Sequence, residues 1–198
     1  MRRRPKARAV DPIIERGEIE RLKSYMASSS NSVEINKRNY MLVVLGINFG
    51  LRASDLCKLK LGDVKDKDYL DIVEQKTNKR RVIRINDAVK RAIAIYIDSF
   101  VYVGDGSYLF PSNKGGCIQP RHLHKLIKQA SRDLEWRGNY GSHTLRKTMA
   151  YHVLAANKSN PDVMQQIMLM FNHSHESITK RYLASSAAID DCYDSLNL

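Results

Sequence analysis

The sequence predicts a mainly α-helical domain with one small antiparallel β-sheet, an α+β fold. Residues 35–49 are apolar on all sides, which is typical of a buried central helix. β-branched residues dominate two short runs, 69–73 and 81–85, and the polar residues 76–79 lie between them, which predicts a β-hairpin. Most of the remaining chain repeats its apolar residues at helical spacing.

The first part of the chain predicts three helices before the hairpin. One is expected over about residues 16–28, with its apolar residues on one side. The apolar helix over 35–49 is expected to end at Gly50, because glycine suits a C-terminal cap. A short helix is expected from Ala53 to about Lys58.

Helical spacing returns after the hairpin, and three helix starts are marked. Pro120 suits the first position of a helix, and Ser142 suits an N-cap. Asn160 and Pro161 cap the helix that carries Val163 to Phe171. The expected helices of this part cover about residues 87–100, 119–135, 143–156, 163–171 and 174–182.

We expect three regions along the chain. Residues 1–12 form a basic flexible arm or linker, since five of the first nine residues are basic. Residues 13–185 form one domain, which suits a chain of this length. Residues 186–198 form a tail helix whose apolar stripe is too short to be stable alone, so it must dock on another surface. That stripe consists of Ile189, Cys192, Tyr193 and Leu196.

The charge of the chain points to a polyanionic partner. Lys and Arg total 33 against 21 Asp and Glu, which gives a formal net charge of +12. A protein this basic releases counterions when it binds phosphates, so nucleic acid is the expected partner. The alternative is a soluble protein that merely avoids zero net charge.

Cysteine usage and hydropathy indicate the compartment. The three cysteines are odd in number and far apart, which argues against a disulfide framework and for a reducing environment. No apolar run approaches the roughly 20 residues that span a bilayer, and the basic start is followed by no apolar segment of a signal peptide. We therefore expect a cytoplasmic protein with no membrane partner.

Individual polar residues give weak signals. Arg52 follows the apolar helix directly, and a charge there needs a partner, which Asp55 is placed to supply three residues later; a surface arginine beside a loop is the alternative. His143 and Arg146 lie three residues apart in the first turn of a helix, so they share a face. A helix N-terminus also carries partial positive charge, which suits a phosphate.

The order of six polar residues is more distinctive than any one of them. They are Arg52 within the segment Gly50–Leu56, Lys76 in the hairpin, His143 and Arg146, and then His173 and Tyr182 nine residues apart. This order and spacing resembles the catalytic domain of the tyrosine recombinases, the phage-integrase family, over roughly residues 15–185. The resemblance implies the fold of that catalytic domain and a prokaryotic, viral or mobile-element origin.

The match departs from the family pattern in places. Phe171 and Asn172 stand where the family usually has Leu-Gly, although asparagine tolerates a left-handed backbone. His175 competes with His173, but nine residues to the tyrosine fits the family and seven does not. Lys79 competes with Lys76 because both lie near the hairpin tip, and the spacing favours Lys76.

The resemblance implies a phosphate clamp. A phosphodiester under attack gains charge on its non-bridging oxygens, which Arg52 and Arg146 suit as planar donors that stay charged. His173 is expected to add a hydrogen bond to the same oxygens, and Asp55 to orient Arg52.

The remaining residues would move protons. The Tyr182 phenol must lose its proton as it attacks phosphorus, and His143 either accepts that proton or positions the phosphate. Lys76 is the expected donor to the leaving 5′ oxygen. The product would be a 3′-phosphotyrosyl link that conserves the bond energy, so neither ATP nor a metal is needed.

No cofactor is expected. The pairs His122/His124 and His173/His175 look like metal ligands, but residues two apart on a helix point in different directions and no Cys pair or acidic cluster accompanies them. Residues that could contact DNA follow from charge alone. These are Arg121, His122, Lys125 and Lys128 on one helix, with Lys79 and Arg80 on the hairpin.

The expected partner is double-stranded DNA. We also expect the chain to form a homo-oligomer, a tetramer, on that DNA. In the recombinases an equivalent C-terminal helix often docks on the neighbouring protomer, so residues 186–198 could dock there or on their own domain. Most family members also carry an N-terminal helical domain. The chain is therefore either a single-domain recombinase or part of a longer integrase, and an accessory DNA-bending or directionality protein could assist it.

Two other functions fit the same residues less well. A type IB topoisomerase shares the chemistry but would relax supercoils as a monomer. A non-catalytic DNA-binding regulator derived from an integrase would have no reason to keep all six residues in register.

Overall fold

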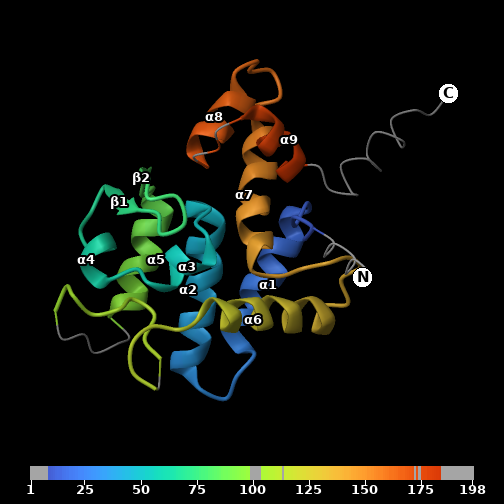
Figure 1. Ribbon diagram of the computed structural model, residues 1–198. Helices are drawn as coiled ribbons and strands as arrows, with labels where there is room; N and C mark the ends of the chain where they lie inside the picture. The colour runs from blue at the N-terminus through green and yellow to red at the C-terminus, as the bar shows by residue number, and fades with distance from the viewer. Residues whose placement is uncertain (1–8, 99–103, 113, 172, 174, 184–198) are drawn as a thin grey trace, which may run out of the picture.

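The structure is a computed structural model that describes residues 9–98, 104–112, 114–171, 173 and 175–183. Within these residues the chain forms nine helices and a two-stranded antiparallel sheet (Figure 1). The mainly helical α+β fold expected from the sequence is confirmed. Of the arm expected over residues 1–12, residues 1–8 lie outside the described residues, whereas Asp11 is buried and its N–H donates to the carbonyl of Asn139 over 2.7 Å. The tail from residue 184 also lies outside the described residues, so the expectations for residues 1–8 and for the tail stay untested.

Helix α2 (Val33–Phe49) forms the centre of the fold, as its all-round apolar character predicts. The Ser32 side chain caps its start by accepting a hydrogen bond from the backbone N–H of Ile35, 3.2 Å away. Gly50 ends it with a left-handed φ of 54°. Helix α1 (Arg16–Ser28) packs along α2, and its bounds coincide with the predicted ones.

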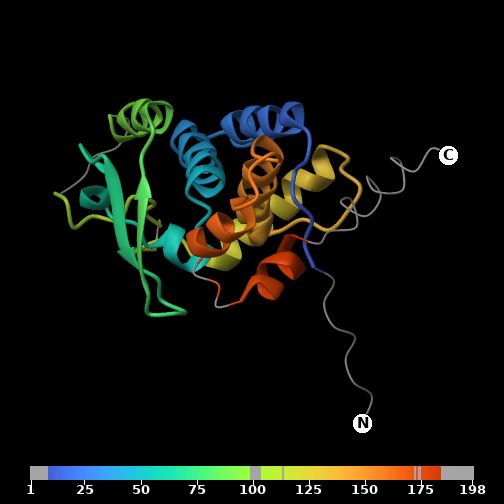
Figure 2. The ribbon, with the colours of Figure 1, turned by 90° about the horizontal axis from the view of Figure 1, so that it is seen from above.

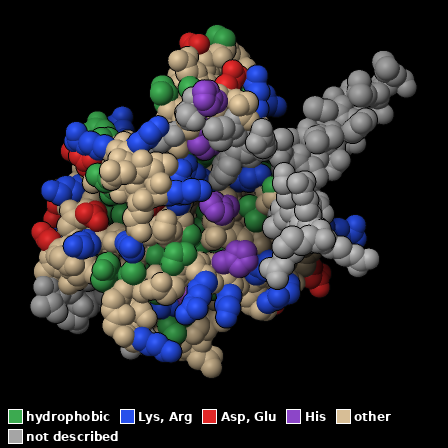
Figure 3. All heavy atoms as spheres, in the orientation of Figure 1, with side chains coloured by type: hydrophobic (Ala, Val, Ile, Leu, Met, Phe, Trp, Pro, Cys, Tyr) green, Lys and Arg blue, Asp and Glu red, His purple; other side chains and the backbone are tan. Residues whose placement is uncertain are grey.

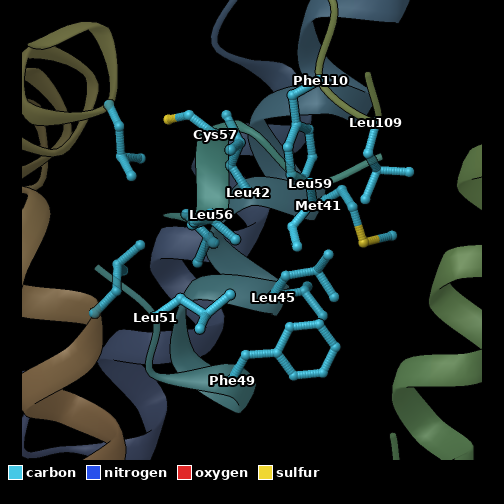
Figure 4. Close-up of a cluster of buried hydrophobic side chains, with 14 of the residues drawn as sticks. Met41, Leu42, Leu45, Phe49, Leu51, Leu56, Cys57, Leu59, Leu109 and Phe110 are labelled. Atoms are coloured by element: carbon cyan, nitrogen blue, oxygen red, sulfur yellow. The ribbon is translucent and has the colours of Figure 1, made fainter. Parts of the chain in front are cut away.

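The main core forms where α2 meets the chain that follows it (Figure 4). Met41, Leu42 and Leu45 of α2 are at most 1% exposed. Figure 4 shows these side chains facing Leu56 and Phe110 from segments further along the sequence. Burial on this scale stabilises the fold by about 1.5–3 kcal/mol for each large side chain, and it fixes the direction in which the chain leaves α2.

The small sheet is a hairpin. Strand β1 (Tyr69–Val73) pairs with β2 (Arg80–Arg84) in antiparallel register, with Tyr69 opposite Arg84 and Val73 opposite Arg80. The second strand begins and ends one residue earlier than expected. Two short helices, α3 (Ala53–Cys57) and α4 (Leu61–Val64), precede the hairpin; α4 was not predicted, because four residues are too few to show a period.

The later helices follow the predicted order: α5 (Asp87–Ile97), α6 (Pro120–Asp133), α7 (Ser142–Ala156), α8 (Val163–Met170) and α9 (Glu176–Leu183). Pro120 opens α6 as expected. Ser142 is the first residue of α7 and not its N-cap; Gly141 holds that position, and its N–H donates to Thr144 Oγ1 over 3.1 Å.

The helices α7, α8 and α9 pack on one another, and a second small core forms between α7 and α8. Figure 2 shows that α9 and the turn of the hairpin project on the same side of the molecule. Among the described residues, no helix combines the length and apolar character needed to cross a bilayer.

Candidate active site

Arg52 owes its position to the end of α2. The left-handed turn at Gly50 redirects the chain, and Arg52 then takes the extended N-cap position of α3. Its side chain is 15% exposed, and its Nη1 lies 2.6 Å from Oε2 of Glu74. The guanidinium is therefore held by a carboxylate from the hairpin while part of it reaches the surface.

The described contact of the Asp55 carboxylate, which was expected to orient Arg52, is with the hairpin. Helix α3 turns its carboxylate toward the hairpin, where Oδ1 accepts the backbone N–H of Gln75 over 3.1 Å. The Gln75 side chain completes the link, because its Nε2 donates to the carbonyl of Ser54 and its Oε1 accepts from Lys58. Asp55 thus holds the turn that carries Lys76, and Glu74 is the carboxylate that pairs with Arg52.

Arg146 lies deeper than Arg52 and is 2% exposed. Its Nη1 donates to the carbonyl of Gly50 over 2.8 Å, and its Nη2 donates to the carbonyl of Phe171 over 3.2 Å. The guanidinium carbon also lies 4.1 Å from the centre of the Phe171 ring, within the range of a cation–π contact. Helix α7 therefore brings Arg146 to the C-terminal end of α2, next to Arg52.

Glu74 joins the two arginines, and sequence reasoning did not identify it. It is fully buried; its Oε1 lies 3.6 Å from Nη1 of both Arg81 and Arg146, and its Oε2 accepts from the Thr77 hydroxyl over 2.9 Å. Burial raises the pKa of Glu74, but hydrogen bonds from Arg52 and Thr77 and the charges of Arg52 and Arg146 together hold it below its ordinary value. The carboxylate is therefore ionised at neutral pH.

Arg81 is the third arginine of this cluster and was also missed. It is 5% exposed, its Nη2 donates to the carbonyl of Phe49 over 2.7 Å, and its Nη1 donates to that of Gly50 over 3.2 Å. Burial, followed by the charge of Arg146, lowers the pKa of Arg81 to about 10. The sequence of β2 contained a signal for this role. Side chains alternate between the two faces of a strand, so Arg81 shares the inner face with Ile83, and a charge on that face requires a buried partner.

Lys76 lies at the centre of the turn formed by residues 75–77, and its side chain is exposed. The turn closes tightly, because the N–H of Glu74 donates to the carbonyl of Lys79 and the N–H of Asn78 donates to the carbonyl of Glu74. Lys79 is exposed as well. The charge of Lys76 acts on His143, which places the turn near the start of α7.

Two histidines border the arginines. The pKa of His143 is lowered by partial burial of the ring, and then by the charges of Arg146, Arg52 and Lys76, although the side chain still reaches the surface. Burial, again with Arg146 and Arg52, lowers the pKa of His173 to about 4. Both rings are therefore neutral at pH 7, as a proton acceptor or a neutral hydrogen-bond partner requires.

Helix α9 carries Tyr182, and its backbone is described while the Tyr182 side chain lies outside the described part of the structure. One contact ties this helix to the site: His173 Nδ1 lies 2.9 Å from Oγ1 of Thr179, which is fully buried. α9 also packs on α7 and α8. Tyr182 is one helical turn from Thr179, so its helix is attached directly to the histidine of the site.

Basic residues extend from the site along α6. Arg121, Lys125 and Lys128 are exposed at spacings that share one helix face. Figure 3 shows Lys, Arg and His side chains gathered on the face of the molecule where α6 lies. His122 differs, because its Nε2 lies 3.3 Å from Nη2 of Arg38 on α2.

The two hairpin residues proposed to contact DNA differ in their surroundings. Arg80 is bound to Asp71 across the hairpin: its Nε donates to Oδ1 over 2.9 Å and to Oδ2 over 3.2 Å, and its Nη2 donates to Oδ2 over 2.5 Å. Lys79 carries its charge at the exposed end of the turn. Among the described residues, no group of three or more His, Cys, Asp or Glu side chains is arranged to hold a metal ion.

The sequence pattern of the phage integrase family matches residues 13–188. The chain belongs to the phage integrase family. The resemblance inferred from the six polar residues is thus confirmed over most of the chain. Five of those six residues have described surroundings. Arg52 and Arg146 pair with the buried carboxylate of Glu74, and the charges of both arginines act on His143 and His173.

Related proteins in bacteria carry recombinase names. The probable integrase/recombinase YoeC of Bacillus subtilis is 33% identical over 175 residues, which cover 88% of this chain and 89% of YoeC. Tyrosine recombinase XerC of Caldanaerobacter subterraneus is 31% identical over 77% of this chain but only 43% of XerC. The chain therefore spans most of one relative and less than half of the other.

Solved structures of recombinases share the fold. The XerA recombinase superposes with a TM-score of 0.70 at 24% identity, covering 95% of this chain and 66% of XerA. The XerH recombinase in a post-cleavage complex with palindromic difH superposes with a TM-score of 0.73 at 17% identity, covering 96% of this chain and 54% of XerH. The catalytic-domain fold of the tyrosine recombinases is confirmed.

Proposed function

We propose that this chain is a site-specific DNA recombinase that cleaves and rejoins strands through a 3′-phosphotyrosyl intermediate on Tyr182. One observation carries the proposal. Arg52 and Arg146, far apart in the sequence, both reach the C-terminal end of α2, within ion-pairing distance of the same carboxylate. Two permanently charged donors at one place suit a phosphate whose charge rises during reaction.

The two arginines would act on the scissile phosphate together. Arg52, the more exposed, faces the non-bridging oxygens, and Arg146 adds its charge from behind the same position. His173, neutral and anchored to Thr179, adds a hydrogen bond to those oxygens. This group stabilises the pentacoordinate phosphorus more than the ground state, which lowers the barrier.

The proton transfers use His143 and Lys76. The Tyr182 phenolic oxygen attacks phosphorus and loses its proton to the neutral ring of His143, which is the role we assign to that residue because its pKa is lowered. The P–O5′ bond breaks, and Lys76 gives a proton to the leaving oxygen. We prefer Lys76 to Lys79 as this donor because the charge of Lys76 acts on His143.

Rejoining reverses these steps. A 5′ hydroxyl attacks the phosphotyrosyl link, Tyr182 leaves as the phenol, and a new strand is formed. The link conserves the energy of the phosphodiester, so the reaction needs neither ATP nor a metal ion.

Double-stranded DNA is the proposed partner. A tetramer of this chain on the DNA would bring the exchanging strands together. The net charge of +12 and the exposed cations of α6 support the DNA contact. Solved XerH and lambda integrase structures, which share this fold, are complexes with DNA. Residues 186–198 would join neighbouring protomers.

A plasmid assay tests the function. A plasmid carrying two copies of a candidate site, taken from DNA that flanks the gene, should yield recombinant circles with the wild-type chain in the presence of EDTA. Tyr182→Phe should yield none, while Tyr69→Phe, which alters an exposed tyrosine on β1, should behave as wild type. Relaxation of a site-free plasmid without recombinants would instead indicate a topoisomerase.

A further inference from the structure

We propose that Glu74 is a positioning residue for strand cleavage: it sets the arginine clamp and the lysine turn in a fixed relation to each other. This inference rests on the proposed function and deepens it. Glu74 would not touch the DNA, because its side chain is fully buried.

Three arginines converge on the carboxylate of Glu74. Arg52 follows α2, Arg81 lies on β2 and Arg146 lies on α7, so three separate parts of the fold meet at Glu74. The distances are 2.6 Å to Arg52 and 3.6 Å to each of the others. Ion pairs in a buried setting hold their partners firmly when their geometry is satisfied.

Glu74 also reduces the positive charge of the cluster. Three guanidinium ions repel one another in a poorly solvated place, and one carboxylate reduces their sum to two positive charges. A phosphodiester attacked by a phenolate carries two negative charges at the pentacoordinate stage, so the cluster matches that stage. Without Glu74, the arginines would move apart or turn away from the phosphate position.

The backbone of Glu74 closes the turn that carries Lys76. Its N–H and carbonyl close the turn through Lys79 and Asn78, and its carboxylate accepts the Thr77 hydroxyl. Lys76 lies inside this turn. One residue therefore fixes both the clamp, through its side chain, and the turn that carries the proton donor, through its main chain.

Glu74→Gln tests the side-chain part, because it keeps the shape and removes the charge. Cleavage of a duplex with a normal scissile phosphate should fall by about 10²-fold or more, the usual effect of losing one aligned oxyanion donor. A methylphosphonate at the scissile position removes the charge that the clamp must neutralise. On that DNA the defect of Glu74→Gln should shrink to a few-fold.

The matched control is Asp71→Asn, which makes the same charge change in the same hairpin at the exposed pair with Arg80. It should cleave both DNAs as wild type does. Thr77→Val is a milder variant in case Glu74→Gln unfolds; it removes one hydrogen bond to the carboxylate and should show a smaller defect with the same relief by methylphosphonate.

Two results would overturn the inference while leaving the proposed function intact. One is wild-type cleavage by Glu74→Gln. The other is an equal loss on both DNAs in Glu74→Gln and Thr77→Val, which would indicate general loss of structure. Absence of covalent product from the wild-type chain on every DNA would contradict the proposed function itself, and this inference with it.

Discussion

At the scale of single residues, the site keeps its histidines neutral. Partial burial of both rings, and then the charges of the arginines that suit a phosphate, disfavour a positive charge on His143 and His173. A neutral His143 can take the tyrosine proton, which a charged one cannot. The same environment makes the stability of the fold sensitive to acid, because the histidines bind protons more weakly in the folded chain than in the unfolded chain.

His173 should therefore contribute a measurable pH dependence. Its pKa is about 4 in the folded chain and about 6.5 unfolded, so its contribution is fully present above pH 6.5 and is lost as pH falls toward 4. After allowance for solvent screening we expect about 1–2 kcal/mol. Urea unfolding at pH 7 and at about pH 4.5 should show a smaller acid loss in His173→Gln than in wild type.

The exposed His175 supplies the control for this measurement. His175→Gln removes an imidazole two residues away and should keep the acid loss of the wild type. An equal acid loss in His173→Gln and wild type would contradict the described surroundings of His173.

At the scale of elements, the C-terminal end of α2 organises the site. The carbonyl of Gly50 accepts from both Arg81 and Arg146, and its left-handed φ of 54° sends the chain to Arg52. An added Cβ at Gly50 would lie 2.3 Å from the Met149 sulfur and 3.2 Å from a Phe171 ring carbon. Both backbone conformation and space therefore require glycine here.

Gly50→Ala should lower the free energy of unfolding by about 2–4 kcal/mol, from left-handed strain and overpacking together. It should also reduce cleavage in the fraction that remains folded, because the shared carbonyl shifts. Gly17→Ala is the matched change, since Gly17 lies in the first turn of α1 with no atom near the added Cβ; there the free energy of unfolding should rise slightly, by about 0.5 kcal/mol at most. Chemical unfolding measures both, and equal effects would refute this reading of Gly50.

The sequence predicted the elements better than their mutual contacts. The bounds of α1 follow from a clear apolar period, and the end of α2 from one glycine. Helix α4 is too short to show a period. The role of Glu74 could not be predicted from the sequence, because it depends on three arginines that only tertiary packing brings together.

At the scale of the whole molecule, the basic surface and the site belong to one function. The exposed cations of α6 lie on the face shown in Figure 3, and the net charge of +12 favours approach to DNA in general. Such contacts set affinity and position more than they set chemistry.

Replacing Arg121, Lys125 and Lys128 with alanine should weaken DNA binding and flatten its salt dependence. Each lost phosphate contact should reduce the slope of log K against log salt by about 0.9. Replacing Lys65 and Lys67, exposed cations of the loop between α4 and β1, should change that slope little. Fluorescence anisotropy across a salt series measures both slopes, and a triple variant with the wild-type slope would remove α6 from the DNA contact.

In the proposed reaction Tyr182 becomes joined to DNA. A duplex nicked just past the cleavage position traps this intermediate, because the released fragment diffuses away and rejoining fails. On a denaturing gel we expect a shifted protein–DNA band for the wild-type chain and none for Tyr182→Phe. A band in both would place the nucleophile elsewhere, with Tyr193 the next candidate, and no band from a wild-type chain that binds the DNA would contradict strand cleavage.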